Sequence, residues 1–572
     1  MKTAFLVENF TKKEKKVVEK FSKKNKINNY EIFSINKENN IDGAKYINVN
    51  KKFYKIQDMA FYLLDQREKE VDDTAEMLSK ITNLNLKMFT KRLLIIKFFY
   101  REAKLLISKE ILLEEKEIKK VIILNKYKDM LINRDDVLNY YNNFKDVFIF
   151  LMALLRYSKY IAKMIILALK KKNITNYGNV INKKSYDIIA VQYTSLHYQL
   201  IKKTLKLLLK KYSIAVTSAF QFHCIEEIVP FKTEKGIDKI KIYPRIRFSD
   251  ILKLIYFFKL LKIKYYKQCI IGNFREILIR IIQCRHIAKE FNPKVILIPT
   301  DGDLFKNVEY AFFNNLGIKY INYMHGDKNY DVELAFIEFH KMAVWGKHYI
   351  NLYEKKLRAK KGMIEVTGNQ LFDEIPKYKI KDKELLILKN KYSRVVSVFT
   401  QWANSHDIVK SQYIMIQKVV NFINKSKNIY LIVKHHPLEF QHLNLDCKPL
   451  LKKIEDRRIE ITNEKRLYDI LAVSDLVITP WSTVGLEAIL FKKPVLFMNF
   501  GDKPRLLEYP KFNAAIEIND PEESEFYLDK MLFDEKYKEK IDYNKVKKNW
   551  ANNLDGLSHF RLKEIIENII DK

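Results

Sequence analysis

The stretch VITPWSTVGLEAILFKKPVLF, residues 477–497, decides the fold. It opens with an apolar run, passes through a short polar segment around Ser482 and Thr483, and continues with a helical pattern that ends before Pro494. A second apolar run follows. Two short apolar runs joined by a helix predict buried parallel strands with a crossover helix between them. This unit is typical of a doubly wound α/β sheet.

The same alternation extends along the chain in both directions. Strand-like runs occur between residues 186 and 325 and again from residue 394, with helical patterns between them. The sequence therefore predicts an α/β protein with two doubly wound, Rossmann-like domains that face each other across a cleft. In such sheets, ligands bind at the carboxyl ends of the strands.

The expected domain limits follow from where these patterns start and stop. We expect an N-terminal domain over residues 1–375, a C-terminal domain over 394–520 and a helical tail over 521–572. Residues from about 55 to 175 contain few Gly or Pro and mix charges with Leu, Ile and Phe. This pattern predicts a helical insertion in the N-terminal domain.

The composition limits the possible partners. The chain of 572 residues has 104 Lys and Arg against 69 Asp and Glu, a net charge of +35. Such an excess attracts polyanions, anionic membranes or phosphorylated substrates. The chain lacks the interleaved aromatic and basic residues of a nucleic-acid module, so we expect no nucleic-acid partner. Its cysteines are far apart and form no CxxC pair, which argues against a zinc site or disulfide framework and fits a reducing cytoplasm: Cys224, Cys269, Cys284 and Cys447.

One segment suggests contact with a membrane surface. In residues 147–172, Arg156, Lys159 and Lys163 fall on one face of a predicted helix. The helix fits either a membrane interface or the surface of a core. No run reaches the ~18 apolar residues of a spanning helix, and the first residues do not read as a secretory signal. We therefore expect a cytoplasmic protein at the inner face of the cytoplasmic membrane.

The polar segment after residue 478 predicts an anion site. A helix N-terminus offers free N–H groups and a positive dipole end to a phosphate. Ser482 and Thr483 add hydroxyls, and Gly485 lets a ligand approach. Glu487, one turn into the helix, is placed to accept hydrogen bonds from ribose hydroxyls. The alternative is that Ser482 or Thr483 only caps the helix.

Two further strand ends carry residues suited to catalysis or phosphate binding. The run LIVKHHPLEF, residues 431–440, ends in residues that suit a donor phosphate: Lys434, His436, Pro437 and Glu439. In YMHGD, residues 323–327, His325 suits a general base that Asp327 could orient. Asp301 and Asp303, around Gly302, are alternative bases, although Asp-Gly is also an ordinary turn.

Four motifs together resemble the GT-B glycosyltransferases of bacterial surface-polysaccharide synthesis. They are MHGD, VTGNQLFDEI, VKHHPLEF and SDLVITPWSTVGLEAILFKKPVLF, and the resemblance covers roughly residues 290–505. The chain is similar to capsule and teichoic-acid transferases, including CDP-glycerol glycerophosphotransferase-like proteins and bacterial sialyl- and polysialyltransferases.

The resemblance implies roles for individual residues. His436 would contact the donor nucleotide or its phosphate, Ser482 and Thr483 the donor phosphate or sugar acid, and Glu487 the ribose. His325 would take part in catalysis. Because helix N–H groups, Lys434 and His436 could stabilise the leaving phosphate, we expect no metal or other cofactor. Two departures stand out: a single acidic residue precedes Gly302 where the sialyltransferases have two, and Asp327 follows the HG pair where the glycerophosphotransferases have threonine.

The expected function is transfer of a sugar from a nucleotide-sugar donor to a glycan or lipid-linked acceptor, without a metal. Transfer of a polyol phosphate from a CDP-activated donor is an alternative. A sugar-nucleotide 2-epimerase shares the predicted layout of two α/β domains. Outside enzymology, the alternative is a basic protein that binds membranes or polyanions.

Overall fold

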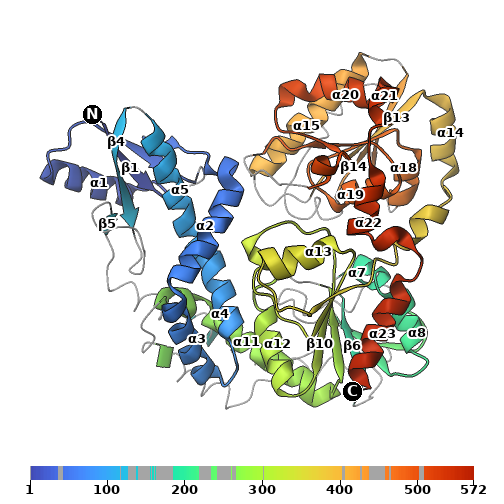
Figure 1. Cartoon of the computed structure of the whole chain (residues 1–572), viewed down its shortest axis with the longest axis horizontal. Coiled ribbons are helices and arrows are strands. Elements are labelled where there is room, and N and C mark those ends of the chain that lie inside the picture. Colours follow the sequence, from blue (N-terminus) through green and yellow to red (C-terminus); the bar gives the residue numbers. More distant parts are fainter. Residues whose placement is uncertain are drawn as a thin grey trace.

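Parallel α/β sheets organise the computed structural model. The structure describes residues 2–36, 43–115, 117–125, 137–139, 152, 155, 158–159, 162, 185–192, 194–217, 233–240, 259–260, 266–299, 302–401, 406–425, 428–436, 458–462, 466–501 and 508–571. These residues form three sheets, each of which carries helices (Figure 1). We call the parts built on them the N-terminal unit, the middle unit and the C-terminal unit.

The N-terminal unit is a five-stranded sheet with the order β3-β2-β1-β4-β5. Its strands are β1 (Lys2–Val7), β2 (Tyr30–Ser34), β3 (Lys45–Tyr46), β4 (Ile118–Asn125) and β5 (Val137–Asn139). Its helices are α1 (Lys12–Lys24), α2 (Phe53–Gln66), α3 (Glu68–Thr82), α4 (Lys87–Leu94) and α5 (Tyr100–Glu114).

This unit differs from the single N-terminal domain expected over residues 1–375. Helices α2 to α5 lie in the connection from β3 to β4, and β4 returns to pair with β1. The helical residues therefore belong to a sheet of their own within residues 2–139. The sequence pattern predicted a helical insertion from about 55 to 175 and did not indicate strands β4 and β5 within it. Their pairing depends on contacts between distant residues, which no local pattern reveals. Most of residues 140–175, including Arg156 and Lys163, lie outside the described residues.

The middle unit has seven strands in the order β12-β11-β10-β9-β6-β7-β8. Its strands are β6 (Ile188–Val191), β7 (Ile214–Thr217), β8 (Ile237–Lys239), β9 (Val295–Ile298), β10 (Lys319–Tyr323), β11 (Lys341–Val344) and β12 (Ile364–Val366). Its helices are α7 (Ser195–Gln199), α8 (Lys202–Leu208), α11 (Lys267–Phe291), α12 (Lys306–Asn315) and α13 (His348–Ile350).

The C-terminal unit has six strands in the order β15-β14-β13-β16-β17-β18. Its strands are β13 (Arg394–Phe399), β14 (Ile429–Lys434), β15 (Ile459–Thr462), β16 (Leu476–Thr479), β17 (Val495–Met498) and β18 (Ile516–Ile518). Its helices are α14 (Lys383–Lys391), α15 (His406–Asn424), α18 (Leu467–Val473), α19 (Thr483–Leu490), α20 (Ser524–Phe533) and α21 (Glu535–Lys538).

The strand orders of the middle and C-terminal units are those of doubly wound sheets. In each sheet the first strand lies inside, the next two extend to one side and the later ones to the other, which is the Rossmann order. All residues of β16 and β17 are buried, as expected for parallel strands covered on both faces. The predicted α/β fold class with two Rossmann-like domains is confirmed.

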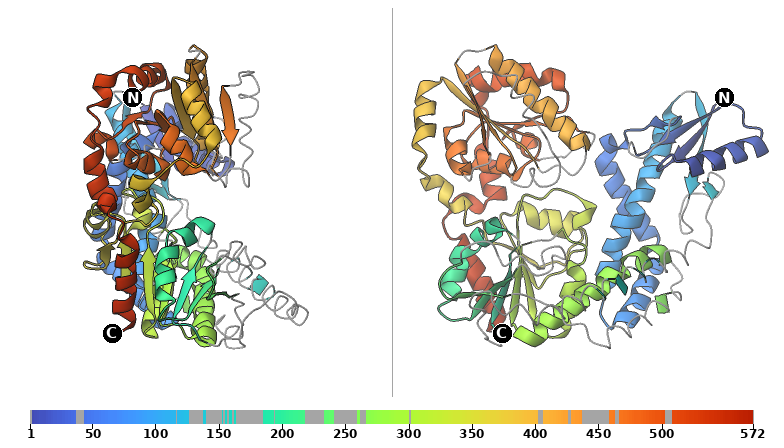
Figure 2. Two further views of the ribbon diagram at one scale, coloured as in Figure 1. Left: turned by 90° about the vertical axis from the view of Figure 1, so that its right-hand side faces the viewer. Right: turned by 180° about the vertical axis from the view of Figure 1, so that it is seen from behind.

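The end of the chain returns from the C-terminal unit to the middle unit. Helices α22 (Tyr543–Trp550) and α23 (Ser558–Ile570) follow α21. The views in Figures 1 and 2 show α23 running along the middle sheet. The Tyr212 hydroxyl donates to Asp571 at 3.0 Å. The chain therefore crosses twice between these units, which fixes their shared boundary.

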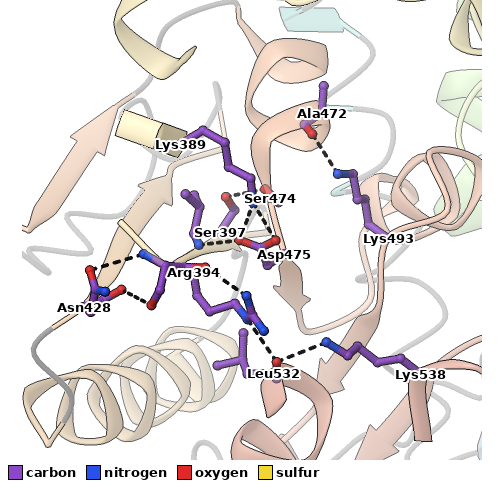
Figure 3. Close-up of polar contacts among 12 residues, drawn as sticks. Lys389, Arg394, Ser397, Asn428, Ala472, Ser474, Asp475, Lys493, Leu532 and Lys538 are labelled. Atoms are coloured by element: carbon purple, nitrogen blue, oxygen red, sulfur yellow. Dashed lines mark hydrogen bonds and ion pairs between the residues drawn. The ribbon is translucent and has the colours of Figure 1, made fainter. Parts of the chain in front are cut away.

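Structural contacts occupy the amino ends of the C-terminal strands (Figure 3). The Asp475 carboxylate, just before β16, accepts from Lys389 Nζ at 2.5 and 2.6 Å and from the Val395 N–H at 2.8 Å. Before β17, Lys493 Nζ donates to the Ala472 carbonyl at 2.7 Å. These contacts hold the sheet at the end opposite to the polar segment around Ser482. Within the described residues, no helix is both long and apolar enough to cross a bilayer.

Candidate active site

The two predicted donor-binding clusters lie at the same edge of the C-terminal sheet. His436 comes two residues after β14, and Ser482 comes three residues after β16. Strand β13 lies between these two strands, and all three are parallel. Two strand spacings separate the clusters by ~10 Å in the plane of the sheet. The clusters therefore have the proximity that a shared phosphate-binding site requires.

Ser482 and Thr483 both use their hydroxyls within the protein. The Ser482 Oγ accepts from the Val484 N–H at 3.3 Å and so caps α19. The Thr483 Oγ1 accepts from the Asp327 N–H of the middle unit at 3.0 Å. A hydroxyl that accepts a hydrogen bond still has its proton to donate. Both side chains are partly exposed, so the capping alternative and a ligand role are compatible.

Gly326 makes the contact between the two units possible. Its φ is +71°, in the left-handed region that favours glycine. A Cβ at this position would lie 3.7 Å from Thr483 Oγ1. The turn at Gly326 directs the Asp327 N–H to Thr483 and leaves His325 at the end of β10, beside the boundary between the units.

Asp327 joins the two units through its side chain. Its Oδ1 accepts from the Tyr349 hydroxyl at 2.6 Å, and its Oδ2 accepts from the hydroxyl of Tyr509, in the C-terminal unit. Burial raises the pKa of Asp327 above its usual value. We expected Asp327 to orient His325. The structure instead engages both carboxylate oxygens with tyrosines, which gives Asp327 a role in holding the units together.

The sequence reasoning missed a second histidine, His197. Its ring contacts His325 edge to face, with the centroids 4.3 Å apart and the planes at 83°. The His197 N–H donates to Thr194 Oγ1 at 3.4 Å, at the start of α7. Burial, together with the nearby His325 and Lys328, lowers the pKa of His197 to about 3. His197 is therefore neutral at neutral pH and packs against the predicted base.

The structure describes the first part of the segment LIVKHHPLEF, which carries His435 and His436. The His436 N–H donates to Thr400 Oγ1 at 3.0 Å, and the Thr400 N–H donates to the Lys434 carbonyl at 3.1 Å. His435 is buried, with 6% exposed, whereas His436 is partly exposed. His436 is thus the more accessible of the pair. Burial lowers the pKa of Lys434.

The other two predicted residues of this edge, Pro437 and Glu439, lie outside the described residues. Their roles at the donor phosphate stay predictions.

Glu487 lies on α19, one turn from Thr483, and is partly exposed. Its Oε1 accepts from the Tyr468 hydroxyl at 3.3 Å. Burial raises the pKa of Glu487 from its ordinary 4.5 to about 7. Its proposed contact with ribose hydroxyls stays a prediction.

Gly485 has a packing role that differs from the expected one. A Cβ there would lie 2.4 Å from the Phe497 ring of β17. The absent side chain allows α19 to approach the sheet, so the expected opening for a ligand is not needed to explain this glycine.

The raised pKa of Glu487 predicts a pH-dependent effect of Glu487→Gln. Between about pH 4.5 and 7 the folded chain keeps this proton while the unfolded chain loses it. The wild type therefore loses stability as pH rises through this interval, whereas the glutamine variant has no such proton to lose. We expect the urea midpoint of Glu487→Gln, relative to wild type, to rise between about pH 4.5 and 8. A difference that does not change with pH would contradict a raised pKa.

Of the two aspartates around Gly302, the structure describes only Asp303. Asp301 lies outside the described residues. Asp303 pairs with Arg280 at 2.9 Å and accepts from the Phe305 N–H at 3.0 Å. Burial alone would raise the pKa of Asp303, but Lys306 and Arg280 outweigh it and hold the pKa below its usual value. A paired carboxylate with a low pKa is a poor base, so the structure assigns Asp303 a structural role.

Comparisons with known proteins agree with the resemblance carried by the motifs. A family model described as CDP-Glycerol:Poly(glycerophosphate) glycerophosphotransferase matches residues 395–505. The chain is 28% identical over 135 residues to the teichoic acid ribitol-phosphate polymerase TarK of Staphylococcus aureus, a match that covers 23% of this chain and 25% of that protein. The chain thus spans about a quarter of the length of this curated relative. The resemblance to surface-polymer transferases of the CDP-glycerol glycerophosphotransferase kind is confirmed.

Solved structures give further similarities. The wall teichoic acid polymerase TagF is 14% identical, covers 73% of this chain and 98% of its own, and has a TM-score of 0.41. The UDP-GlcNAc 2-epimerase from Methanocaldococcus jannaschii is 15% identical, covers 67% and 98%, and also has a TM-score of 0.41.

Proposed function

We propose that this protein transfers a polyol phosphate from a CDP-activated polyol to the hydroxyl end of a surface polymer of the teichoic-acid kind. One observation carries the proposal. The segment that matches the glycerophosphotransferase model contains the donor-side residues Lys434, His436, Ser482, Thr483 and Glu487. The sequence reasoning favoured sugar transfer and kept polyol phosphate transfer as an alternative, and this match favours the alternative.

The proposed reaction is a displacement at phosphorus. The acceptor oxygen forms a bond to the phosphorus that carries the polyol, and the bond from that phosphorus to the oxygen of CMP breaks. His325 takes the proton of the acceptor hydroxyl as general base. The products are CMP and a polymer that is longer by one phosphodiester-linked polyol.

The C-terminal unit would hold the donor. The N-terminus of α19 and the hydroxyls of Ser482 and Thr483 bind the diphosphate. Lys434 and His436 add positive charge at the same sheet edge, and donors arranged in advance stabilise the charge that develops in the transition state. Glu487 binds the ribose. No step in this scheme requires a metal or another cofactor.

The acceptor would reach the protein at a membrane surface. The excess positive charge of +35 supports contact with an anionic membrane surface, where a lipid-linked acceptor would be presented at the cytoplasmic face.

Donor screening tests the proposal. Purified protein is incubated with CDP-glycerol, CDP-ribitol, UDP-sugars and CMP-sugars, each with and without a polymer acceptor. We expect acceptor-dependent release of CMP from a CDP-polyol and new phosphodiester signals in the ³¹P NMR spectrum of the polymer. Release of a nucleotide only from sugar donors would favour glycosyl transfer. A changed sugar nucleotide without any acceptor would favour an epimerase, and no turnover together with strongly salt-dependent polyanion binding would favour a binding protein.

A further inference from the structure

A pocket lies where the three units meet, apart from the edge of the C-terminal sheet that carries Ser482 and His436. It has a volume of about 590 Å³ and is lined by Tyr54 and Phe61 of α2, by Tyr330 and Arg358 of the middle unit and by Lys511 of the C-terminal unit, among others. Figures 1 and 2 show α2 running beside the other two units from the side of the N-terminal sheet. The pocket therefore exists only when the N-terminal unit is in place.

Three aromatic rings form one wall of this pocket. The ring of Tyr330 stacks on Tyr54, with centroids 5.8 Å apart and planes at 23°, and on Phe61, at 6.4 Å and 9°. Tyr330 is also fixed through its hydroxyl, which donates to Asp58 at 2.8 Å. A fixed aromatic wall offers apolar surface to the carbon chain of a sugar or polyol.

A cation lies over each of these rings. Arg358 Cζ is 4.6 Å from the centroid of Phe61, and the ammonium groups of Lys356 and Lys511 are each 5.9 Å from the centroids of Tyr330 and Tyr54, respectively. Distances below about 6 Å allow cation–π attraction. The pocket therefore combines ring faces with positive charge.

Some of these cations are already paired, and others are available. Arg358 pairs with Asp65 at 2.7 Å, and Lys356 pairs with Glu508 at 3.1 Å. Arg358 also has a φ of +56°, a backbone conformation that persists outside glycine only where the surroundings hold it. Among the residues that the structure describes, no carboxylate forms a salt bridge with the exposed ammonium groups of Lys355 or Lys511.

The pocket is connected to the predicted base through one loop. Tyr330 comes five residues after His325, so the two lie at most ~17 Å apart along the chain. Tyr509, whose neighbour Glu508 lines the pocket, donates its hydroxyl to Asp327 in the same loop. A polymer chain that extends from His325 would need to span no more than this distance to reach the pocket.

We propose that this junction pocket binds the polyol phosphate chain of the acceptor a short distance behind its reactive hydroxyl. Lys355 and Lys511 contact its phosphates, the aromatic wall contacts its carbon chain, and Glu508 accepts from its hydroxyls. This inference rests on the proposed function, since it names the acceptor of that reaction. It also gives the N-terminal unit a purpose, because α2 supplies the aromatic wall.

Binding of a lipid-free poly(glycerol phosphate) oligomer tests the proposal without requiring turnover. Calorimetric titrations compare the wild-type chain with the double variant Lys355→Ala/Lys511→Ala. The matched control is Lys536→Ala/Lys540→Ala, which removes the same charge from exposed positions in and just after α21. We expect the pocket variant to bind the oligomer at least about ten-fold more weakly than the wild type. We expect the control to bind it with the affinity of the wild type. Equal affinity of all three chains for CDP verifies that the donor half is intact.

Several results would overturn the pocket assignment. They are equal oligomer affinity in the pocket and control variants, no binding of the oligomer by the wild type, and equally tight binding of inorganic polyphosphate, which lacks the polyol. Loss of binding to phosphatidylglycerol vesicles alone would make the surface a lipid site and would also overturn it. The proposed function fails separately, if the wild type releases no CMP from a CDP-polyol.

Discussion

Replacing His325 with alanine should lower the rate of CMP release by about 10²–10⁴-fold, the usual contribution of a general base. The His325 ring lies at the end of β10, beside the loop that contacts Thr483 across the boundary between the units. In the proposed reaction, His325 deprotonates the acceptor hydroxyl while the donor phosphates lie at α19. The measurement is the initial rate of CMP release from a CDP-polyol with saturating acceptor.

His286→Ala on α11 is a suitable control for this prediction. His286 is partly exposed and contacts Phe291 in the middle unit, so its loss removes an imidazole of the same unit without touching the loop of His325. If His325→Ala retained full turnover, our choice of base would be wrong. Asp301 would then be the next candidate, because Asp303 is occupied by Arg280.

The common position of the Ser482 and His436 clusters at one sheet edge could be predicted from the sequence because the signals are local. The residues around Ser482 and His436 each follow directly on an apolar strand, and parallel strands of one sheet end at one edge. Knowledge of the strand order was not needed to expect both clusters on the same side. The cap at Ser482 was likewise readable, since serine before a helical run is a common N-cap.

Contacts between distant residues could not be predicted in this way. The Asp327 N–H meets Thr483 across 156 positions of sequence, and His197 meets His325 across more than a hundred. No spacing rule links such residues. A weaker signal for His197 was present, because Thr194 and Ser195 after the strand at 188–191 are typical of a helix start at a strand end.

The N-terminal sheet shows the same limit at the level of the fold. Nothing in the sequence of strand β4, IKKVIILN, indicates that it pairs with β1. The helical pattern at α2 to α5 was recognised, but it was predicted as an insertion in one N-terminal domain, and strands β4 and β5 in the same stretch were not predicted. The position of the N-terminal sheet places α2 where it supplies an aromatic wall of the junction pocket.

Asp327→Ala should lower the free energy of unfolding by about 2–4 kcal/mol, because it leaves two buried donors without their acceptor. Tyr349 and Tyr509 are 0% and 1% exposed, and each donates its hydroxyl to Asp327. The loss should be largest for a transition that reports separation of the middle and C-terminal units. Urea unfolding followed by tryptophan fluorescence measures it, since Trp345 and Trp550 lie in the surroundings of Tyr349 and Tyr509.

A double-mutant cycle separates the bridge from simple loss of a side chain. Tyr509→Phe removes only the hydroxyl from the C-terminal unit and keeps the ring, so it should cost about 1–2 kcal/mol in the wild type and much less in the Asp327→Ala background. Asp327→Asn keeps one carbonyl acceptor and should lie between wild type and alanine. If the cost of Tyr509→Phe were the same in both backgrounds, Asp327 would not couple the two units. The turn at Gly326, the Thr483 hydrogen bond and the contact with His197 would then contribute to the position of the predicted base without help from Asp327.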